Sequence, residues 1–304
     1  MAGWERTRVY RNHHLDSTRW DAIEARDGDV VITTSYKSGT TWTQHIVGQL
    51  LLRDVPDAPP TLLVSPWIDA RFQMPLEVLV PMVAAQTHRR FLKSHLAADG
   101  LPYRTGTKYV VVARDARDVF MSLLNHYAGY TDVAMERLND DPSLPAFERF
   151  DGDVKKLWRQ WISQGWFAWE SDGYPWWGNL HHTASYWPHR DLENVLLVHY
   201  NDLKADLPAE IRRIAGFLDL ELRDDEVGNV VRESQIDRMR EVATEREDML
   251  AAFLDGGAKR FFFKGTNGRW RDVLDGDDLA LYEEAKRRVL TPECAMWLER
   301  GYRG

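Results

Sequence analysis

Cysteine is almost absent from the chain, since Cys294 is the only one among 304 residues. A single cysteine excludes an internal disulfide and suits a reducing compartment. Long apolar runs are also missing, because no stretch approaches the ~20 residues of a membrane-spanning helix, and residues 1–6 lack the apolar core of a signal peptide. These absences favour a cytoplasmic protein without a membrane span.

Internal repeats, low-complexity tracts and an obvious linker are absent as well. The length suits one large α/β domain or two small ones. Without a linker we expect a single domain over residues 1–304. The net charge of −8 argues against a general nucleic-acid binder. A local basic site must therefore hold any anionic ligand.

The ordinary P-loop signature, Gly-x-x-x-x-Gly-Lys-Ser/Thr, is missing too, because Lys37 precedes Gly39. A β-branched apolar run over residues 30–34 nevertheless passes through a polar loop into a helical pattern that begins at Trp42. Backbone N–H groups, the helix dipole and the Lys37 charge would converge on one point there, and Gly39 would allow a ligand to approach closely. Thr40 alone could be a helix cap, and Lys37 alone a solvated charge. Together the loop residues predict a phosphate-binding loop.

The order Lys-Ser-Gly-Thr-Thr-Trp resembles the 5′-phosphosulfate loop of sulfotransferases that use 3′-phosphoadenosine 5′-phosphosulfate (PAPS). That loop usually reads Tyr-Pro-Lys-Ser-Gly-Thr-Thr-Trp, and Ser35 and Tyr36 replace Tyr-Pro here. The resemblance implies that the 5′-phosphosulfate is held by Lys37, Ser38, Gly39, Thr40, Thr41 and Trp42.

A second polar cluster ends a short strand expected over residues 90–95, and ligands of α/β sheets bind beyond the carboxyl ends of the strands. A lone histidine is more often structural than catalytic. The run Lys93-Ser94-His95-Leu96, however, matches the Lys-Thr/Ser-His-Leu segment of the same family. The resemblance implies that His95 is the general base, that Lys93 helps at the sulfuryl group, and that Lys37 neutralises the leaving phosphate.

A third β-branched run, residues 108–113, ends at Arg114 and is followed by a helical stretch that carries Ser122. The plain alternative is a surface cluster of Arg/Asp ion pairs, which contribute little. The segment resembles the family's Arg-x-Pro/Ala-Lys/Arg-Asp-Val-x-x-Ser. The resemblance implies that Arg114 and Ser122 bind the 3′-phosphate and that Asp118 orients basic neighbours.

A strand that begins at residue 195 and the helix after it resemble the family's Tyr-Glu-Asp-Leu/Met-Lys segment, with Asn201 in place of Glu. The resemblance implies that Tyr200 contacts the adenine. It also implies that Ser234 faces the nucleotide.

Residues 158–187 hold seven of the 13 tryptophans of the chain. Core packing would account for roughly half of these rings. The adjacent His181 and His182 lack the cysteine partners or the i,i+4 spacing of a metal site. Family members have a stretch rich in glycine and aromatic residues here, so the resemblance implies an acceptor-binding segment at about residues 140–190.

Near the C-terminus, residues 263–270 resemble the family's Arg-Lys-Gly-x-x-Gly-Asp-Trp segment, but Phe263 stands at the arginine and Arg269 at the aspartate. One guanidinium that would bind the 3′-phosphate is therefore missing. We expect Arg260 or Arg269 to replace it, and Phe263 to pack against the sheet or the adenine.

The same segment implies that Lys264 and Gly265 bind the 3′-phosphate within a mobile lid at about residues 240–270. Many family members dimerise through a Thr-Val pair soon after this segment, and residues 271–276 lack that pair. We therefore expect a monomer, or a dimer built on another interface.

Strands alternate with helical patterns along the chain, which favours a parallel sheet. We expect a three-layer, P-loop-like α/β fold with a central, mostly parallel sheet flanked by helices. The resemblance implies PAPS as co-substrate, 3′-phosphoadenosine 5′-phosphate (PAP) as product, no metal ion, and transfer to a hydroxyl or amine of a small aromatic or apolar acceptor. The motifs do not specify that acceptor.

Two alternatives stay open. A kinase that uses ATP and Mg²⁺ would share the architecture, but it should carry the missing P-loop signature. A catalytically silent nucleotide-binding module is the other, because the residues at the lid are altered.

Overall fold

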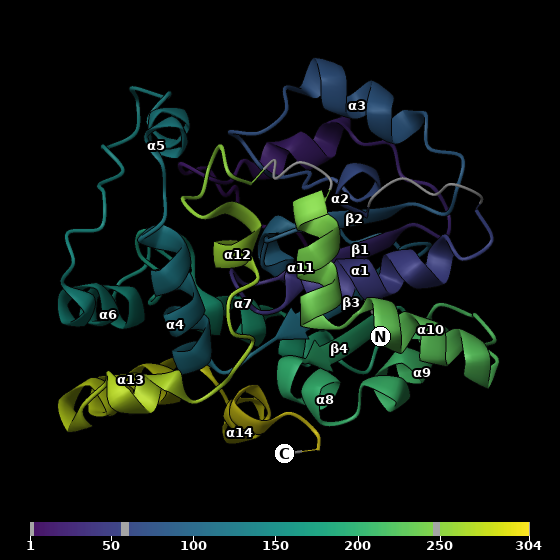
Figure 1. Ribbon diagram of the computed structural model, residues 1–304. Coiled ribbons are helices and arrows are strands. Elements are labelled where there is room, and N and C mark those ends of the chain that lie inside the picture. Colours follow the sequence, from purple (N-terminus) through teal and green to yellow (C-terminus); the bar gives the residue numbers. More distant parts are fainter. Residues whose placement is uncertain (1–2, 56–60, 246–249, 304) are drawn as a thin grey trace.

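The centre of the protein is a four-stranded parallel sheet. The structure is a computed structural model that describes residues 3–55, 61–245 and 250–303. The strands are β1 (Val30–Thr34), β2 (Phe91–Ser94), β3 (Lys108–Ala113) and β4 (Val195–His199), in the order β2-β1-β3-β4. All three neighbouring pairs are parallel, which confirms the expected central sheet (Figure 1).

The described residues also form helices along the whole chain. The α-helices are α1 (Thr40–Leu51), α2 (Thr61–Val64), α3 (Leu76–Ala84), α4 (Ala116–Tyr127), α5 (Asp132–Leu138), α6 (Val154–Ser163), α7 (Asn179–Tyr186), α8 (Tyr200–Ala205), α9 (Leu207–Phe217), α10 (Asp224–Glu233), α11 (Ile236–Glu245), α12 (Gly257–Phe261), α13 (Gly276–Val289) and α14 (Pro292–Arg300). Short 3₁₀ helices are η1 (Ser17–Ala22), η2 (Ala98–Gly100), η3 (Trp187–His189) and η4 (Arg269–Asp272). Within the described ranges, none of these helices combines the length and apolar character needed to cross a membrane.

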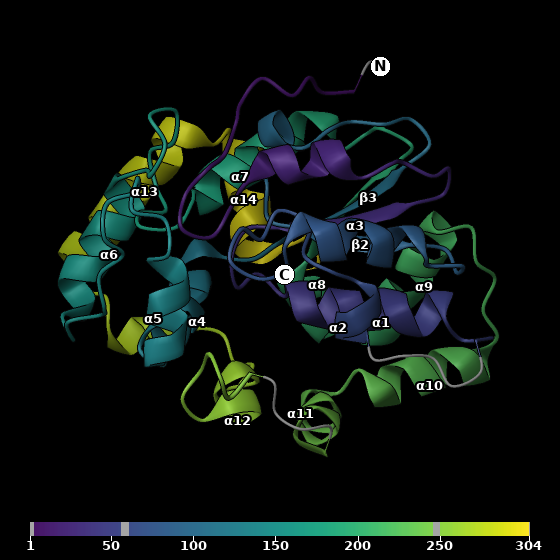
Figure 2. The same ribbon diagram turned by 90° about the horizontal axis from the view of Figure 1, so that it is seen from above.

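Successive residues of β1 face opposite sides of the sheet. Ile32 packs in one apolar cluster with Ile46 of α1, whereas Val31 belongs to a second cluster that includes Leu180 of α7. Strands of this kind are buried on both faces and therefore read as continuous apolar runs. Figure 2 shows α1 and α9 on one side of the strands and α7 and α14 on the other, which confirms the three-layer arrangement.

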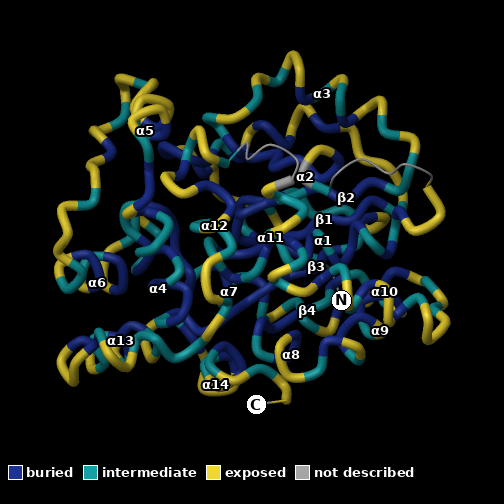
Figure 3. The backbone as a smooth tube through the Cα atoms, viewed as in Figure 1, coloured by how far each residue is buried: buried dark blue, intermediate teal, exposed yellow. Residues whose placement is uncertain are grey.

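A group of helices beside α4 extends the second cluster. The ring centroids of Phe120 and Trp158 lie 4.9 Å apart with an edge-on geometry, and Trp158 Nε1 donates a hydrogen bond to the Asp278 carbonyl. These contacts fasten α4, α6 and α13 together. Exposed residues gather on the outer surfaces of such peripheral helices, while the strands are almost wholly buried (Figure 3).

The order of the strands reverses at β1, because β2 lies on one side of it and β3 on the other. The register places Thr34 opposite Val112 and Thr33 opposite Ser94. The loops that follow the three strands therefore emerge side by side at one edge of the sheet. In open α/β sheets this reversal is the place where ligands bind.

The packing of α1 on the sheet can be tested at Ile46, whose side chain is fully buried. We expect Ile46→Ala to lower the free energy of unfolding by about 2–5 kcal/mol, because it removes apolar contacts and leaves a cavity. Val133, which is 46% exposed on α5, provides the control, and Val133→Ala should change stability by less than ~0.5 kcal/mol. Urea denaturation measures both, and equal losses would contradict this packing.

Candidate active site

The loop between β1 and α1 has an unusual backbone. Lys37 has a φ of 61° and Gly39 a φ of 110°. Gly39 is also the N-cap of α1 and no side chain caps this end, so Thr40 is not the cap that its hydroxyl might suggest. A Cβ on Gly39 would lie 3.0 Å from Cδ2 of Tyr200. Glycine is needed here both for the left-handed conformation and for the close approach of Tyr200.

Hydroxyl groups tie this loop to the protein around it. Ser35 Oγ and Ser38 Oγ share a hydrogen bond of 2.7 Å, and Asn179 Nδ2 donates to Ser35 Oγ at 2.5 Å. Thr34 Oγ1 and Thr40 Oγ1 share another of 2.6 Å. The Ser38 and Thr40 hydroxyls, expected to face a phosphate, thus have protein partners. Sequence reasoning missed Asn179, which lies 144 residues from its partner Ser35 and outside any motif.

The Lys37 ammonium lies at the mouth of the loop, 4.5 Å from the ring centroid of Phe261 and 6.0 Å from that of Tyr36. None of the carboxylates in the described residues forms an ion pair with it. Burial lowers its pKa to about 7, and the charges of Lys93 and Arg114 act in the same direction. A bound anion would stabilise the protonated form of Lys37 and raise its pKa.

Lys93 is the last residue but one of β2, and its Nζ lies 4.5 Å from the ring centroid of Trp67. Burial lowers its pKa to about 8, and the Asp69 carboxylate opposes that shift. Lys93 and Lys37 are 56 positions apart in the sequence, but the fold brings them close enough for the charge of Lys93 to lower the pKa of Lys37.

His95 is buried directly after β2, with only 2% of its surface exposed. Its Nδ1 lies 2.8 Å from the Thr34 carbonyl oxygen, which can only accept, so Nδ1 carries the hydrogen and Nε2 keeps its lone pair. Burial above all, and then the Lys93 charge, hold the pKa of His95 well below 6.5. The rings of Trp67 and Trp177 lie 4.7 and 5.4 Å from its ring. A neutral imidazole with one free nitrogen between aromatic walls can accept a proton.

Asp69 holds the backbone of His95 in place and was missed by sequence reasoning. Its carboxylate accepts from the His95 amide at 3.0 Å and from the indole nitrogens of Trp20 at 3.0 Å and Trp67 at 2.7 Å. Burial raises its pKa, while these hydrogen bonds act in the opposite direction. The residue lies in the irregular stretch between α2 and α3, where the sequence offers no periodic signal.

Arg114 follows β3 and is nearly buried, with 5% exposed. One Nη donates to Asn267 Oδ1 at 2.7 Å, and the guanidinium carbon lies 4.0 Å from the ring centroid of Tyr200. Its Nε is buried and finds no partner among the described residues. A buried donor of this kind is usually satisfied, so this Nε is a candidate donor to an anionic ligand.

Arg269 lies beside Arg114. Burial is the main cause that lowers the pKa of Arg269, and the positive charge of Arg114 lowers it further. It donates through Nη2 to the Met121 carbonyl at 3.3 Å, next to Ser122, and its Nε is buried without a partner in the described chain. Asp118 accepts from the Gly268 amide at 2.7 Å. The Asp118 contact therefore holds the backbone that presents Arg269.

For two residues of this region the structure narrows the alternatives that the sequence left open. Phe263 does not pack against the sheet: it is 36% exposed, and Arg269 and Lys264 lie over its ring at 5.1 and 5.5 Å. Its contact with the adenine stays a prediction. Arg260 is directed elsewhere, because it donates to the carbonyls of Asp255 at 2.6 Å and Asn125 at 3.2 Å. Arg269, and not Arg260, accompanies Arg114.

Lys264 itself is exposed. The expected lid at about residues 240–270 includes residues 246–249, which lie outside the described residues, so its mobility stays a prediction.

The residues expected on the adenine side gather around Tyr200. The rings of Trp42 and Tyr200 lie 5.4 Å apart, and Trp42 Nε1 donates to the Ser234 carbonyl at 2.9 Å. The Tyr200 hydroxyl donates to the Gly265 carbonyl at 3.3 Å. The Ser234 hydroxyl is buried and unpartnered within the described ranges. Thr41, in the first turn of α1, is partly exposed beside this group.

The tryptophan-rich segment divides between core and site. Trp158 and Trp161 are core residues, whereas Trp177 lies 5.1 Å from Tyr36 and 5.4 Å from His95. The paired histidines have separate partners: His181 bonds to Tyr10 at 3.0 Å, and His182 to Thr33 at 3.1 Å. Among the described residues, no group of three or more His, Cys, Asp or Glu side chains could hold a metal ion.

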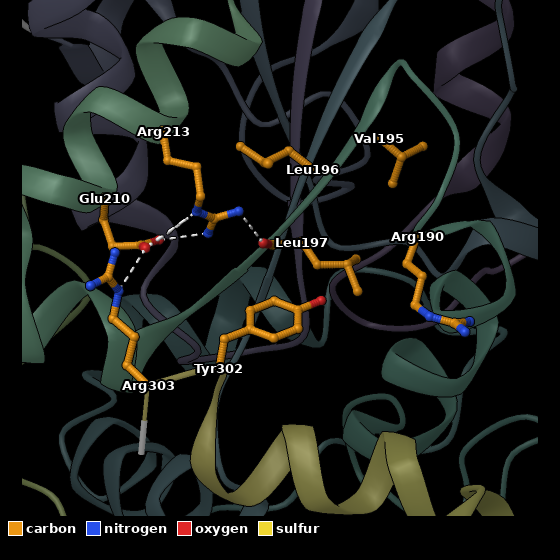
Figure 4. Close-up of a pocket in the computed structure, with 8 residues that line it drawn as sticks. All are labelled: Arg190, Val195, Leu196, Leu197, Glu210, Arg213, Tyr302 and Arg303. Carbon is orange, nitrogen blue, oxygen red and sulfur yellow. Dashed lines mark hydrogen bonds and ion pairs between the residues drawn. The ribbon is translucent and has the colours of Figure 1, made fainter.

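A separate pocket of about 410 Å³ lies at the outer edge of β4 (Figure 4). Its charged groups pair with one another: Glu210 accepts from Arg213 at 2.5 Å and from Arg303 at 3.4 Å, and Arg213 also donates to the Leu197 carbonyl. It contains none of the residues singled out from the sequence.

Comparison with known proteins agrees with the geometry. The sulfotransferase domain model matches residues 27–291. A glycolipid sulfotransferase of Mycobacterium tuberculosis is 33% identical, with 97% of this chain and 95% of that protein covered. Human sulfotransferase 1C2 is 27% identical over 88% of this chain and 85% of its own.

Solved structures share the fold. Mouse sulfotransferase SULT7A1 complexed with PAP superimposes with a TM-score of 0.66 at 22% identity, covering 91% of this chain and 90% of that one. Retinol dehydratase in a complex with retinol and PAP gives a TM-score of 0.68 at 23% identity, covering 91% of this chain and 87% of that one. The fold and the family match lead to one conclusion: the chain belongs to the sulfotransferase family.

Proposed function

We propose that this sulfotransferase transfers a sulfuryl group from PAPS to a hydroxyl or amine of a small acceptor. One observation carries the proposal: the free Nε2 of a neutral His95 lies in the same buried site as two lysines without ion-pair partners in the described chain. Positive charge for a leaving phosphate and a base for the acceptor are what such a transfer requires.

The nucleotide fits the polar atoms that the protein leaves unpaired. Ser234 Oγ lies beside Trp42 and Tyr200, where an adenine would be held, and Arg114 Nε and Arg269 Nε lie where a 3′-phosphate would be held. Fork-shaped guanidinium groups suit phosphate oxygens. We assign adenine binding to Trp42, Tyr200 and Ser234. We assign 3′-phosphate binding to Arg114, Arg269 and Ser122, with Lys264 and Gly265 on the outer side of the phosphate.

Different groups of the protein carry out different parts of the proposed reaction. When bound, PAPS supplies the sulfuryl group, whose transfer leaves negative charge on the 5′-phosphate. Lys37 and the amides of residues 38–42 neutralise that charge at the N-terminus of α1. Lys93 lies on the sulfuryl side, and His95 Nε2 accepts the acceptor proton. The Thr34 carbonyl fixes the tautomer of His95, and Asp69 fixes its backbone.

The acceptor meets aromatic walls at Trp67 and Trp177, so we propose a small acceptor with an apolar or ring-shaped face. A relative at 33% identity is named a glycolipid sulfotransferase, so sugar hydroxyls belong among the candidates. We further propose a single domain, a cytoplasmic location consistent with the lone Cys294, and a monomer or a dimer that does not use residues 271–276.

The 3′-phosphate assignment predicts a difference between two arginines. Arg269→Ala should weaken PAP binding by ~10- to 100-fold while changing adenosine 5′-monophosphate binding little, because it removes a charge-assisted contact to the 3′-phosphate alone. Arg260→Ala, the matched control, should leave both affinities unchanged. Calorimetric titration measures all of them. A parent protein that does not prefer PAP over the monophosphate would overturn the assignment.

The base assignment predicts the pH dependence of turnover. Incubation with PAPS and a panel of phenols, alcohols, glycosides and amines should release PAP, and His95→Ala should lower kcat by ~10²–10⁴-fold with PAP affinity intact. Because burial holds the pKa of His95 well below 6.5, its neutral form persists and kcat/KM should not fall as pH drops from 8 to 6.5. Near-normal turnover by the His95→Ala enzyme would contradict the assignment of His95 as the general base.

The two lysines predict a proton linkage. Their pKa values of about 7 and about 8 in the free protein lie below the ordinary value, and a bound anion raises them. At pH 8 the phosphates are fully ionised, so PAP binding should take up about one proton, and affinity should fall as pH rises through 7 to 9. Titrations in two buffers of different ionisation enthalpy measure the uptake. Lys37→Gln should remove most of it; unchanged uptake in that variant would contradict the linkage.

A further inference from the structure

Three imidazoles from separate parts of the chain surround the ring of Tyr36. Their centroids lie 5.8 Å (His95), 5.5 Å (His126) and 6.3 Å (His14) from that ring. His14 comes from the N-terminal segment, and His126 from the last turn of α4. Together with Tyr130 we call His14, Tyr36 and His126 the Tyr36 cluster. Sequence reasoning singled out none of its members as a site residue.

Hydrogen bonds connect the cluster into a chain. The hydroxyls of Tyr36 and Tyr130 share a hydrogen bond of 3.2 Å, and the Tyr130 hydroxyl also bonds to His14 Nε2 at 3.4 Å. Burial raises the pKa of Tyr36 well above its usual value, so this hydroxyl stays protonated. The chain ends at Tyr36, which is partly exposed and therefore within reach of a ligand.

The cluster leaves hydrogen-bonding capacity unused. Nδ1 of His14 and Nδ1 of His126 are buried and lack partners among the residues described. Burial lowers the pKa of both groups well below 6.5, assisted at His126 by the charge of Lys37. Neutral imidazoles offer a donor and an acceptor each, and a buried polar atom without a partner is destabilising. His14 is itself buried, whereas His126 and Tyr36 are partly exposed. A ligand group that both donates and accepts would therefore find its partners in Tyr36 and His126.

The cluster adjoins the reacting groups on the side away from the adenine. Tyr36 immediately precedes Lys37 and contacts the base His95, while the adenine side is built around Tyr200 and Trp42. In the usual loop of this family a proline stands at the Tyr36 position and carries no such group. The feature therefore belongs to recognition of the acceptor in this chain.

We propose that the Tyr36 cluster binds a second hydroxyl group of the acceptor, close to the hydroxyl that His95 deprotonates. The acceptor is then a vicinal diol, either on a sugar ring or on an aromatic ring. A hydroxyl matches neutral tyrosine and histidine groups because it donates and accepts. A cationic group would be repelled by Lys37 and Lys93. This inference rests on the proposed sulfuryl transfer and names the acceptor class of that same site.

Two acceptor pairs test the inference: 4-nitrocatechol against 4-nitrophenol, and octyl glucoside against 1-octanol. Binding is measured by calorimetry with PAP present, and turnover by PAP release from PAPS. We expect the parent to favour the diol of at least one pair by about fivefold to tenfold, the size of one or two hydrogen bonds. The favoured pair shows whether the diol is aromatic or a sugar.

Variants isolate the cluster from the general chemistry of the acceptors. Tyr36→Phe and His126→Phe should each bring the diol preference close to one. Tyr127→Phe is the matched control, because its hydroxyl donates to the Glu148 carbonyl near the cluster but outside the chain of hydrogen bonds. It should keep the preference. Comparing ratios between variants cancels differences in acidity between the two acceptors.

The outcomes separate the two proposals. Absence of PAP release with every acceptor overturns the proposed transfer, while the binding ratios still report on the cluster. Equal binding of both members of each pair by the parent, binding of neither, or a preference that survives both cluster variants overturns this inference. A preference lost equally in Tyr127→Phe also overturns it, since the effect is then one of packing.

Discussion

The ammonium groups of Lys37 and Lys93 lie partly buried at the carboxyl edge of the sheet, and neither pairs with a carboxylate of the described residues. Removing charge from water is unfavourable, and a nearby opposite charge normally compensates. The Asp69 carboxylate supplies part of that compensation at Lys93, whereas none of the described carboxylates acts on the pKa of Lys37, which an anionic ligand would stabilise. The folded sheet supplies the stability that tolerates this arrangement, because Ile32, which pairs with Lys93 on one side and with Val110 on the other, is fully buried, as is Val110.

The same requirement explains the protein contacts of the neighbouring groups. The backbone is left-handed at Lys37 and Gly39, a feature of loops whose successive amides form anion-binding concavities. Asn179 of α7, on the face of the sheet opposite α1, holds this turn through its hydrogen bond to Ser35. His95 stays neutral because it is buried next to Lys93, so the positive charge that suits a phosphate also keeps this imidazole unprotonated. In the proposed mechanism, binding and proton transfer therefore depend on one electrostatic arrangement.

The sequence predicted the parts of this arrangement that local patterns encode. Apolar β-branched runs located β1, β3 and β4, and their alternation with helices predicted the parallel sheet. Asp69, Asn179 and the Tyr36 cluster could not be found in this way. The contact of Asp69 with His95 spans 26 residues and that of Asn179 with Ser35 spans 144, and such contacts depend on the packing of irregular segments. The choice between Arg260, which precedes the altered motif, and Arg269, which lies within it, likewise depended on contacts with backbone carbonyls that the sequence does not reveal.

One segment contacts both halves of the site. Residues 253–255 are bonded to residues 129–131 beside Tyr130, and Phe261 lies 4.5 Å from the Lys37 ammonium and 6.0 Å from the His126 ring. A few residues later, the Gly265 carbonyl accepts from Tyr200 on the adenine side. In the proposed function, any displacement of this segment therefore changes the nucleotide contacts and the acceptor contacts together. Since coupling between two ligands is reciprocal, a nucleotide that orders this segment strengthens acceptor binding, and an acceptor that holds the Tyr36 cluster in place strengthens nucleotide binding to the same extent.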